Sequence, residues 1–311
     1  MFVIRETPGR GLGAFATEDI PAGTVILREQ PVLQLLNQEW TNHNPNVCRS
    51  LMEAFDALDD AEKARIKELY AYIPDQLVTK VEHIVDTVLA QRKHDKGTSR
   101  NEYVNLVFQM TTNEWKILGL SYDTSALYLR LSRFNHSCSA NALNYEESLP
   151  DGTQVKVVRA RRHVRTAEEI TIEYMTPWME DRAGYLRRTW GFDCSCSVCD
   201  SSGNSGMDHA TRAEYERTFR QIRENDEDNF RHEHSTPTQI LLRHQRRAAA
   251  LQTLGPSVFL MNELANGVKL YTSSGDQEKV VETLKALYRV MTIVCDEDDP
   301  YRLALQAKFG P

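Results

Sequence analysis

The sequence lacks the features that would assign it to a membrane or secreted class of protein. No uninterrupted apolar run approaches the roughly 20 residues that cross a bilayer, and residues 1–6 do not begin a basic segment followed by an apolar one. Only six cysteines occur among 311 residues, and their clustering is not that of a secreted disulfide framework. These absences lead us to expect a soluble protein of the cytoplasm, the nucleus or both, with no membrane partner.

An excess of basic residues is also missing. The chain has 37 Lys and Arg against 44 Asp and Glu, for a formal net charge of −7. Such a chain does not present the basic face that phosphates require, so direct binding of nucleic acid is not expected. An acidic surface suits a basic substrate, such as a lysine-bearing peptide, although acidity also serves solubility alone.

Residues 9–13, Gly-Arg-Gly-Leu-Gly, are glycine-rich but do not match the common phosphate loops. No Gly-Lys-Ser or Gly-Lys-Thr follows, and the leading strand and following helix of a dinucleotide site are missing. Glycine lets the backbone approach a ligand closely, although many such stretches are only turns. Asn135 and His136 are similarly open to two interpretations, because adjacent amide and imidazole groups can recognise a ligand or satisfy a buried turn.

The hydrophobic pattern predicts an α+β fold. Short apolar runs separated by proline and glycine predict strands within residues 1–38, and helical spacing predicts two helices within residues 47–93, separated by Pro74. Further elements are expected downstream. A helix runs from residue 103 to Phe108, with a turn at residues 111–113, and a hairpin turn at residues 150–152 lies between Tyr145 and Val155. Strands are expected at residues 153–159 and 169–174, a flexible linker at residues 201–206, and helices from residue 210 onward.

The densest chemical signal is a cysteine cluster. Cys194, Cys196 and Cys199 follow the spacing C-x-C-x-x-C, which lets three thiolates bind one zinc ion. A closed tetrahedron needs a fourth ligand from elsewhere, and it would make the metal structural. The candidates for that fourth position are Cys48, Cys138, Cys295, His136, His163 and His209.

Four motifs occur in a fixed order and together resemble the SET-domain lysine methyltransferases. They are Arg10-Gly11-Leu12-Gly13-Ala14-Phe15, Asn135-His136-Ser137-Cys138, Glu168-Glu169-Ile170-Thr171-Ile172-Glu173-Tyr174 and the cysteine cluster. The chain is most similar to the SET-and-MYND branch and its fungal relatives, over residues 1–200. The resemblance implies a β-rich, knot-like SET fold and the transfer of methyl groups from S-adenosylmethionine to the side-chain amine of lysine in a histone or non-histone protein.

The resemblance also implies roles for individual residues. Tyr174 is expected to be catalytic, and Phe134 and Trp190 are expected to line the substrate channel. The expected zinc ligands are Cys138, Cys194, Cys196 and Cys199. The expected cofactor-binding residues are Arg10, Gly11, Leu12, Gly13, Asn113, Asn135, His136 and Phe192.

Two departures from the branch change what is expected. Trp190 stands where the family often has a channel tyrosine, and residues 39–104 contain only Cys48, so no multi-zinc MYND module can form there. We expect the N-terminal SET part at residues 1–38, a helical insertion at 39–104, the C-terminal SET part at 105–177, a post-SET zinc segment at 178–203 and a helical region at 204–311. A monomer is expected. The alternative function is a catalytically weak SET-fold module or scaffold that recognises a peptide through the cleft and the C-terminal helices.

Overall fold

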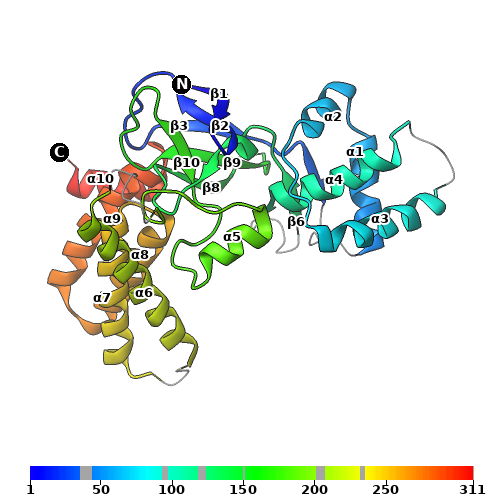
Figure 1. Cartoon of the computed structure of the whole chain (residues 1–311). Helices are drawn as coiled ribbons and strands as arrows, with labels where there is room; N and C mark the ends of the chain where they lie inside the picture. The colour runs from blue at the N-terminus through cyan, green and yellow to red at the C-terminus, as the bar shows by residue number, and fades with distance from the viewer. Residues whose placement is uncertain are drawn as a thin grey trace.

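The chain folds into three small β-sheets with helices on two sides, as the computed structural model shows (Figure 1). It describes residues 1–35, 44–92, 97–117, 124–149, 151–200, 207–231 and 235–310. The sheets lie in the centre, helices α1 to α4 extend from one side, and helices α6 to α10 lie on the other. This mixed arrangement confirms the predicted α+β class.

Ten strands make up the described sheets. The first sheet has the order β1-β2-β10-β7, the second β3-β9-β8 and the third β4-β6-β5. Their bounds are β1 Phe2–Thr7, β2 Gly11–Ala16, β3 Val25–Glu29, β4 Leu33–Leu35, β5 Glu114–Ile117, β6 Thr124–Leu127, β7 Asn135–His136, β8 Ala142–Ser148, β9 Gln154–Ala160 and β10 Glu169–Ile172.

The parallel pairing of β7 with β10 brings distant motifs together. Thr171 lies opposite Asn135, and Ile172 lies opposite His136. Ile170 and Ile172 are buried in the central core, as the alternation of apolar side chains along a strand requires. Tyr174 follows two residues after β10 and is therefore held beside the Asn-His pair.

Four helices form a layer beside the third sheet. They are α1 (Pro45–Asp56), α2 (Asp60–Lys67), α3 (Asp75–Ala90) and α4 (Arg100–Asn113). Capping boxes start α2 and α4, and Pro74 precedes α3, because a proline is tolerated before a helix but not inside it. Three helices, rather than the two expected, occupy residues 45–90, since the capping box of Asp59 and Glu62 starts a separate short helix there.

The turn predicted at residues 111–113 is wrong, because α4 continues through Asn113. The hydroxyls of Thr111 and Thr112 donate to the carbonyls of Val107 and Phe108, each over 2.8 Å. These bonds satisfy side chains that would otherwise favour a turn. Helix α4 therefore runs across residues 104 and 105, where the helical insertion was predicted to end and the C-terminal SET part to begin. The division of the chain into segments stays a prediction.

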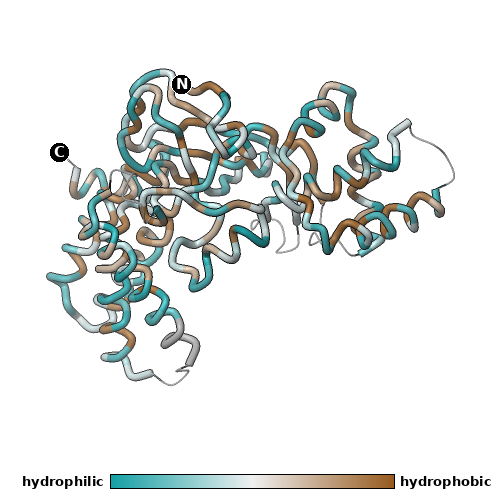
Figure 2. The backbone as a smooth tube through the Cα atoms, in the orientation of Figure 1, coloured by the Kyte–Doolittle hydropathy of each residue, from teal (hydrophilic) through white to brown (hydrophobic). Residues whose placement is uncertain are grey.

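The C-terminal part is helical, as predicted. Its helices are α6 (His209–Arg231), α7 (Pro237–Leu254), α8 (Val258–Ser274), α9 (Gln277–Val294) and α10 (Pro300–Phe309). The short helix η1 (Leu131–Arg133) and helix α5 (Arg182–Trp190), which were not predicted, come earlier in the chain than these helices. Hydrophobic and hydrophilic segments alternate along these helices (Figure 2). Within the described parts of the chain, no helix is long and apolar enough to cross a membrane.

The strands expected at residues 153–159 and 169–174 are present as β9 and β10. Strands β8 and β9 pair antiparallel, and Gly152 adopts the left-handed conformation in their connection with φ +86°. Residue 150 and the linker expected at residues 201–206 lie outside the described residues.

Two ion pairs of Asp296 join the second sheet to the C-terminal helices. Asp296, just after α9, pairs with Arg28 at 2.5 Å and with Arg159, whose side chain is only 4% exposed. We expect Asp296→Ala to lower the free energy of unfolding by about 3–5 kcal/mol, because the buried Arg159 cation loses the carboxylate that is paired with it.

The matched control is Glu147→Ala, which removes an ion pair with the more exposed Arg28 at 3.1 Å. Its cost is expected to stay within about 1 kcal/mol. Both values are measured by urea unfolding, and equal losses in the two variants would contradict the role of Asp296.

Candidate active site

One cavity of about 310 Å³ collects most of the residues singled out in the sequence. That volume lies at the lower end of the range for small-molecule sites. Nine of the expected site residues line it: Arg10, Gly11, Leu12, Asn113, Asn135, His136, Tyr174, Trp190 and Phe192. Two others, Gly13 and Phe134, are buried behind this lining.

Gly13 is required by the close approach of three polar side chains. A Cβ atom there would lie 2.5 Å from Thr7 Oγ1, 2.7 Å from Glu169 Oε1 and 2.9 Å from Asn135 Nδ2. Gly11, in the preceding turn, has φ +67°, a conformation that favours glycine. The glycine turn, residues 9–13, is thus packed directly against motifs that lie more than a hundred residues later in the chain.

Glu169 connects two of the motifs at this side of the cavity, although it is not among the site residues predicted from the sequence. Its Oε1 accepts from Asn135 Nδ2 at 2.8 Å, and its other oxygen pairs with Arg10. Asn135 Nδ2 also donates to the carbonyl of Leu12 over 3.2 Å. The only signal was the alternation in β10, where Ile170 and Ile172 face the core and Glu169 therefore faces away.

Tyr174 directs its hydroxyl to the backbone of the Asn-His segment. The hydroxyl donates to the Phe134 carbonyl oxygen over 2.8 Å, and the ring centroid lies 5.2 Å from that of Trp190. Burial, and secondarily the negative charge of Glu169, raise the pKa of Tyr174 above its ordinary value. The hydroxyl is therefore protonated at neutral pH, which excludes it as a strong base.

The helical layer supplies a second wall of the cavity. Trp190 Nε1 donates to the Thr112 carbonyl oxygen over 2.8 Å. Asn113 Nδ2 donates to the carbonyl oxygens of Tyr70 at 2.7 Å and Gln109 at 2.8 Å. The polar edge of Trp190 is thus committed to α4, and the indole presents apolar ring surface beside Tyr174.

His136 is deeply buried in the wall of the cavity, at 3% exposure. Burial lowers the pKa of its imidazole to about 4, so the ring is neutral at physiological pH. Its ring centroid is 5.4 Å from that of Tyr174 and 6.3 Å from that of Phe192.

The four expected metal-binding cysteines converge at one point. The sulfur atoms of Cys138, Cys194, Cys196 and Cys199 all lie within 4.8 Å of one another. A tetrahedral zinc ion with Zn–S bonds of about 2.3 Å places its sulfurs about 3.8 Å apart, and Cys138 Sγ lies 3.6 Å from Cys199 Sγ. These four thiols fit one structural zinc ion. Among the candidates that the spacing left open for the fourth ligand, Cys138 is the one that lies in this group.

The cluster is also part of a hydrophobic core shared with the C-terminal helices. Cys138 and Val198 are buried in the same core as Phe219, Ile222 and Leu251. Collapse of the cluster would therefore expose apolar surface of α6 and α7 as well.

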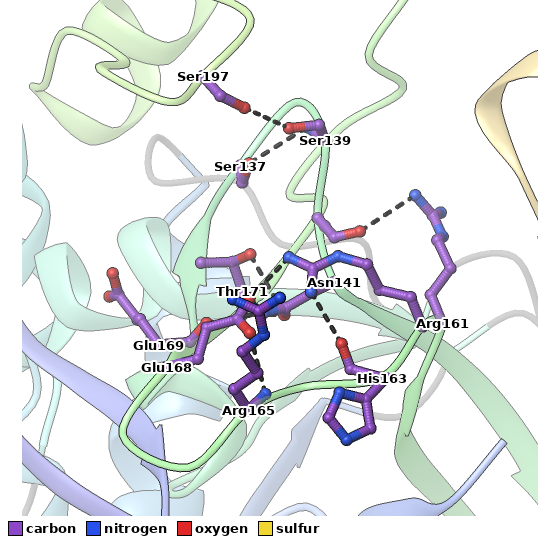
Figure 3. A network of polar contacts seen from close by, with 12 residues as sticks. Ser137, Ser139, Asn141, Arg161, His163, Arg165, Glu168, Glu169, Thr171 and Ser197 are labelled. Atoms are coloured by element: carbon purple, nitrogen blue, oxygen red, sulfur yellow. Dashed lines mark hydrogen bonds and ion pairs between the residues drawn. The ribbon is translucent and has the colours of Figure 1, made fainter. Parts of the chain in front are cut away.

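A polar network connects the segment after Cys138 to β10 (Figure 3). Asn141, 2% exposed, donates to Glu168 Oε1 at 2.9 Å and to the Glu169 carbonyl at 2.8 Å, and it accepts from the Thr171 amide at 2.8 Å. Ser139 joins the same segment to Ser197 in the cysteine cluster, with 3.0 Å between the hydroxyl oxygens. The sequence offered no pattern that distinguishes Asn141 from a surface asparagine.

We expect Asn141→Ala to lower the free energy of unfolding by about 2–4 kcal/mol, because it removes three hydrogen bonds made by one buried side chain. Asn144→Ala is the matched control, since among the described residues Asn144 Nδ2 donates to the Glu173 carbonyl alone, over 3.1 Å. The control is expected to cost about 1 kcal/mol. Chemical denaturation measures both, and a cost at Asn141 no larger than that at Asn144 would contradict the assignment.

Comparison with known proteins identifies the family. The SET domain model matches residues 11–175, more than half of the 311 residues. The chain therefore belongs to the SET domain family. The matched region contains Gly11–Gly13 of the glycine turn, the Asn-His pair and Tyr174, and it ends before the Cys194–Cys199 part of the cluster.

Individual relatives are similar over shorter segments. A SET domain-containing protein of Acanthamoeba polyphaga mimivirus is 26% identical over 204 residues, which cover 62% of this chain and 75% of that protein. A histone-lysine N-methyltransferase of Yarrowia lipolytica is 35% identical over 85 residues, covering 27% of this chain. One from Scheffersomyces stipitis is 36% identical over 105 residues, covering 33% of this chain. The matched segments span about a fifth of these two fungal proteins, 19% and 20%.

Among solved structures, the SET domain of LSMT bound to lysine and AdoHcy is similar at 12% identity with a TM-score of 0.43. The match covers 99% of this chain and 83% of that chain. At this level the similarity adds nothing to the family assignment.

Proposed function

We propose that this chain transfers a methyl group from S-adenosylmethionine to the side-chain amine of lysine in a protein substrate. The observation that carries the proposal is the position of the Tyr174 hydroxyl, 2.8 Å from the Phe134 carbonyl oxygen, in a cavity that also contains the glycine turn, Asn135 and Phe192. Family membership and the names of the fungal relatives support the same reaction.

The donor set of the cavity fits S-adenosylmethionine. When bound, this cofactor supplies a methyl group on a positively charged sulfur. We propose that the backbone of residues 10–13, with Asn135 and Asn113, holds its amino-acid part, and that Phe192 covers its adenine. The close packing at Gly13 supports this assignment, because it holds the Asn135 side chain beside residues 10–12, which line the cavity.

Tyr174 and the carbonyl of Phe134 would orient the incoming amine. Free lysine has a pKa of about 10.4, and an apolar channel lowers it by disfavouring the ammonium. Trp190 contributes such a surface, since its indole N–H is bonded to the Thr112 carbonyl oxygen. Alignment of the neutral amine with the methyl group then supplies most of the rate enhancement.

The cysteine cluster would hold one structural zinc ion and so form a post-SET segment. The four sulfurs lie within 4.8 Å of one another, and four thiolates leave no open position for chemistry. No MYND module is proposed, since the described part of residues 39–104 forms helices in which Cys48 is buried.

The substrate is proposed to be a protein or peptide with an accessible lysine, bound by a monomer in the cytoplasm or nucleus without direct contact to nucleic acid. We further propose the segment division 1–38, 39–104, 105–177, 178–203 and 204–311. The helical layer at residues 39–104 would act as an insertion into the SET fold, and residues 204–311 would support the substrate cleft.

The decisive experiment incubates the purified chain and a cell lysate with S-adenosylmethionine labelled on its methyl group. Label on lysine of one or a few proteins, located by mass spectrometry, is the expected result. Binding of the cofactor without label on any protein would reject the enzyme and favour the alternative of a peptide-binding SET module.

A further inference from the structure

His136 is enclosed between the cysteine cluster and the strand that leads to Tyr174. Its Nε2 lies 3.4 Å from Cys138 Sγ, and its Nδ1 lies 3.2 Å from the backbone nitrogen of Tyr174. The ring is 3% exposed. Both ring nitrogens are therefore occupied by groups of the chain itself.

The two partners determine which ring nitrogen carries a proton. A backbone N–H can only donate, so Nδ1 of His136 must accept from Tyr174. The proton is then on Nε2 and points to the sulfur of Cys138. A metal-bound cysteine is a thiolate and accepts such a bond, so the geometry suits the metal-loaded state.

We infer that His136 is a positioning residue of the metal centre: its Nε2–H donates to the Cys138 thiolate, while its Nδ1 holds the backbone of Tyr174. This inference rests on the proposed zinc site and deepens it. Four thiolates around one divalent ion carry a net charge of −2, and an N–H donor reduces the excess charge on sulfur. Outer groups of this kind orient the ligands and strengthen metal binding.

The same ring connects the metal centre to the active site. Loss of the metal would free the Cys138 side chain. The His136 ring, which accepts from the amide of Tyr174, would then lose the partner of its Nε2 atom. Conversely, with both nitrogens engaged, His136 has only its backbone and ring surface to offer a cofactor. The zinc centre would thus support the position of Tyr174 through one imidazole as well as stabilising the fold.

The test compares His136→Phe with wild type in purified, zinc-loaded protein. Phenylalanine keeps a buried ring but removes both hydrogen bonds. Transfer of zinc to a chromophoric chelator is expected to be about 10–100-fold faster in the variant. The control is His163→Phe, at an exposed histidine whose side chain is 53% exposed, and it should match wild type.

A second measurement does not depend on a folded variant. Long-range nitrogen–proton correlation spectra of the wild type should show His136 protonated at Nε2 and unprotonated at Nδ1, the nitrogen that accepts from the Tyr174 amide. Protonation at Nδ1, or zinc release unchanged by His136→Phe, would overturn the inference. Cofactor affinity is measured in parallel, and its loss with unchanged zinc release would assign His136 to the cofactor instead.

These outcomes distinguish failure of the inference about His136 from failure of the proposed zinc site. If the purified wild-type protein contains no zinc, the metal centre and the inference are both refuted. Wild type containing zinc that His136→Phe releases at the wild-type rate would refute the inference alone.

Discussion

Tyr174→Phe is expected to lower kcat for methyl transfer by about 100-fold or more, since removing one hydrogen-bonding group that acts on the reacting atoms typically costs that much. The substitution deletes the hydroxyl that donates to the Phe134 carbonyl oxygen over 2.8 Å. It retains the ring that lies 5.2 Å from Trp190. Affinity for S-adenosylmethionine should therefore change only a few-fold, as measured by calorimetry.

Tyr185→Phe is the matched control for this prediction. Tyr185 is 36% exposed, and its ring packs edge-on against Trp190 with 5.8 Å between centroids, but it does not line the cavity. Full methyl transfer in Tyr174→Phe, or an equal loss in Tyr185→Phe, would remove Tyr174 from the catalytic role.

The pH profile gives an independent check of that role. Burial and the Glu169 carboxylate raise the pKa of Tyr174 above its ordinary value, so this hydroxyl does not ionise in the neutral range. The rate should then increase with pH as the substrate amine loses its proton. A decrease between pH 7 and pH 9 that is absent in Tyr174→Phe would contradict the direction of this shift.

Cys196→Ser is expected to abolish zinc binding and to unfold much of the region around the cluster. Serine offers a neutral hydroxyl instead of a thiolate, and structural zinc contributes about 10–16 kcal/mol of apparent binding free energy in small zinc modules. The loss should extend into the C-terminal helices, because the cysteines share a hydrophobic core with Phe219 and Leu251. Metal analysis and circular dichroism measure both effects.

Cys295→Ser serves as the control for the metal prediction. Cys295 is half-buried beyond α9, and its thiol contacts Met261 Sδ at 3.6 Å. It should retain zinc and helical content at the wild-type level. Zinc retained in Cys196→Ser, or lost equally in Cys295→Ser, would contradict the proposed ligand set.

Local patterns were sufficient for much of the secondary structure. Pro74 separates helices because it lacks an amide proton, and alternating side chains predict β9 and β10 because successive residues face opposite sides of a strand. The patterns failed at residues 111–113, where threonines suggested a turn. Their hydroxyls instead bond back to the helix at Val107 and Phe108, a choice that spacing does not reveal.

The sequence by itself determined the type of chemistry available, since three clustered cysteines favour a thiolate metal site and the ordered motifs match one family. Only the tertiary structure decided which groups meet. Glu169 connects Asn135 to Arg10, and His136 lies between Cys138 and Tyr174. Cys138, which the family resemblance had already implied as the fourth ligand, lies beside cysteines more than fifty positions later in the chain. These contacts follow from the pairing of β7 with β10 and from burial of the cluster against the C-terminal helices. Residue spacing along the chain carries no information about such long-range packing.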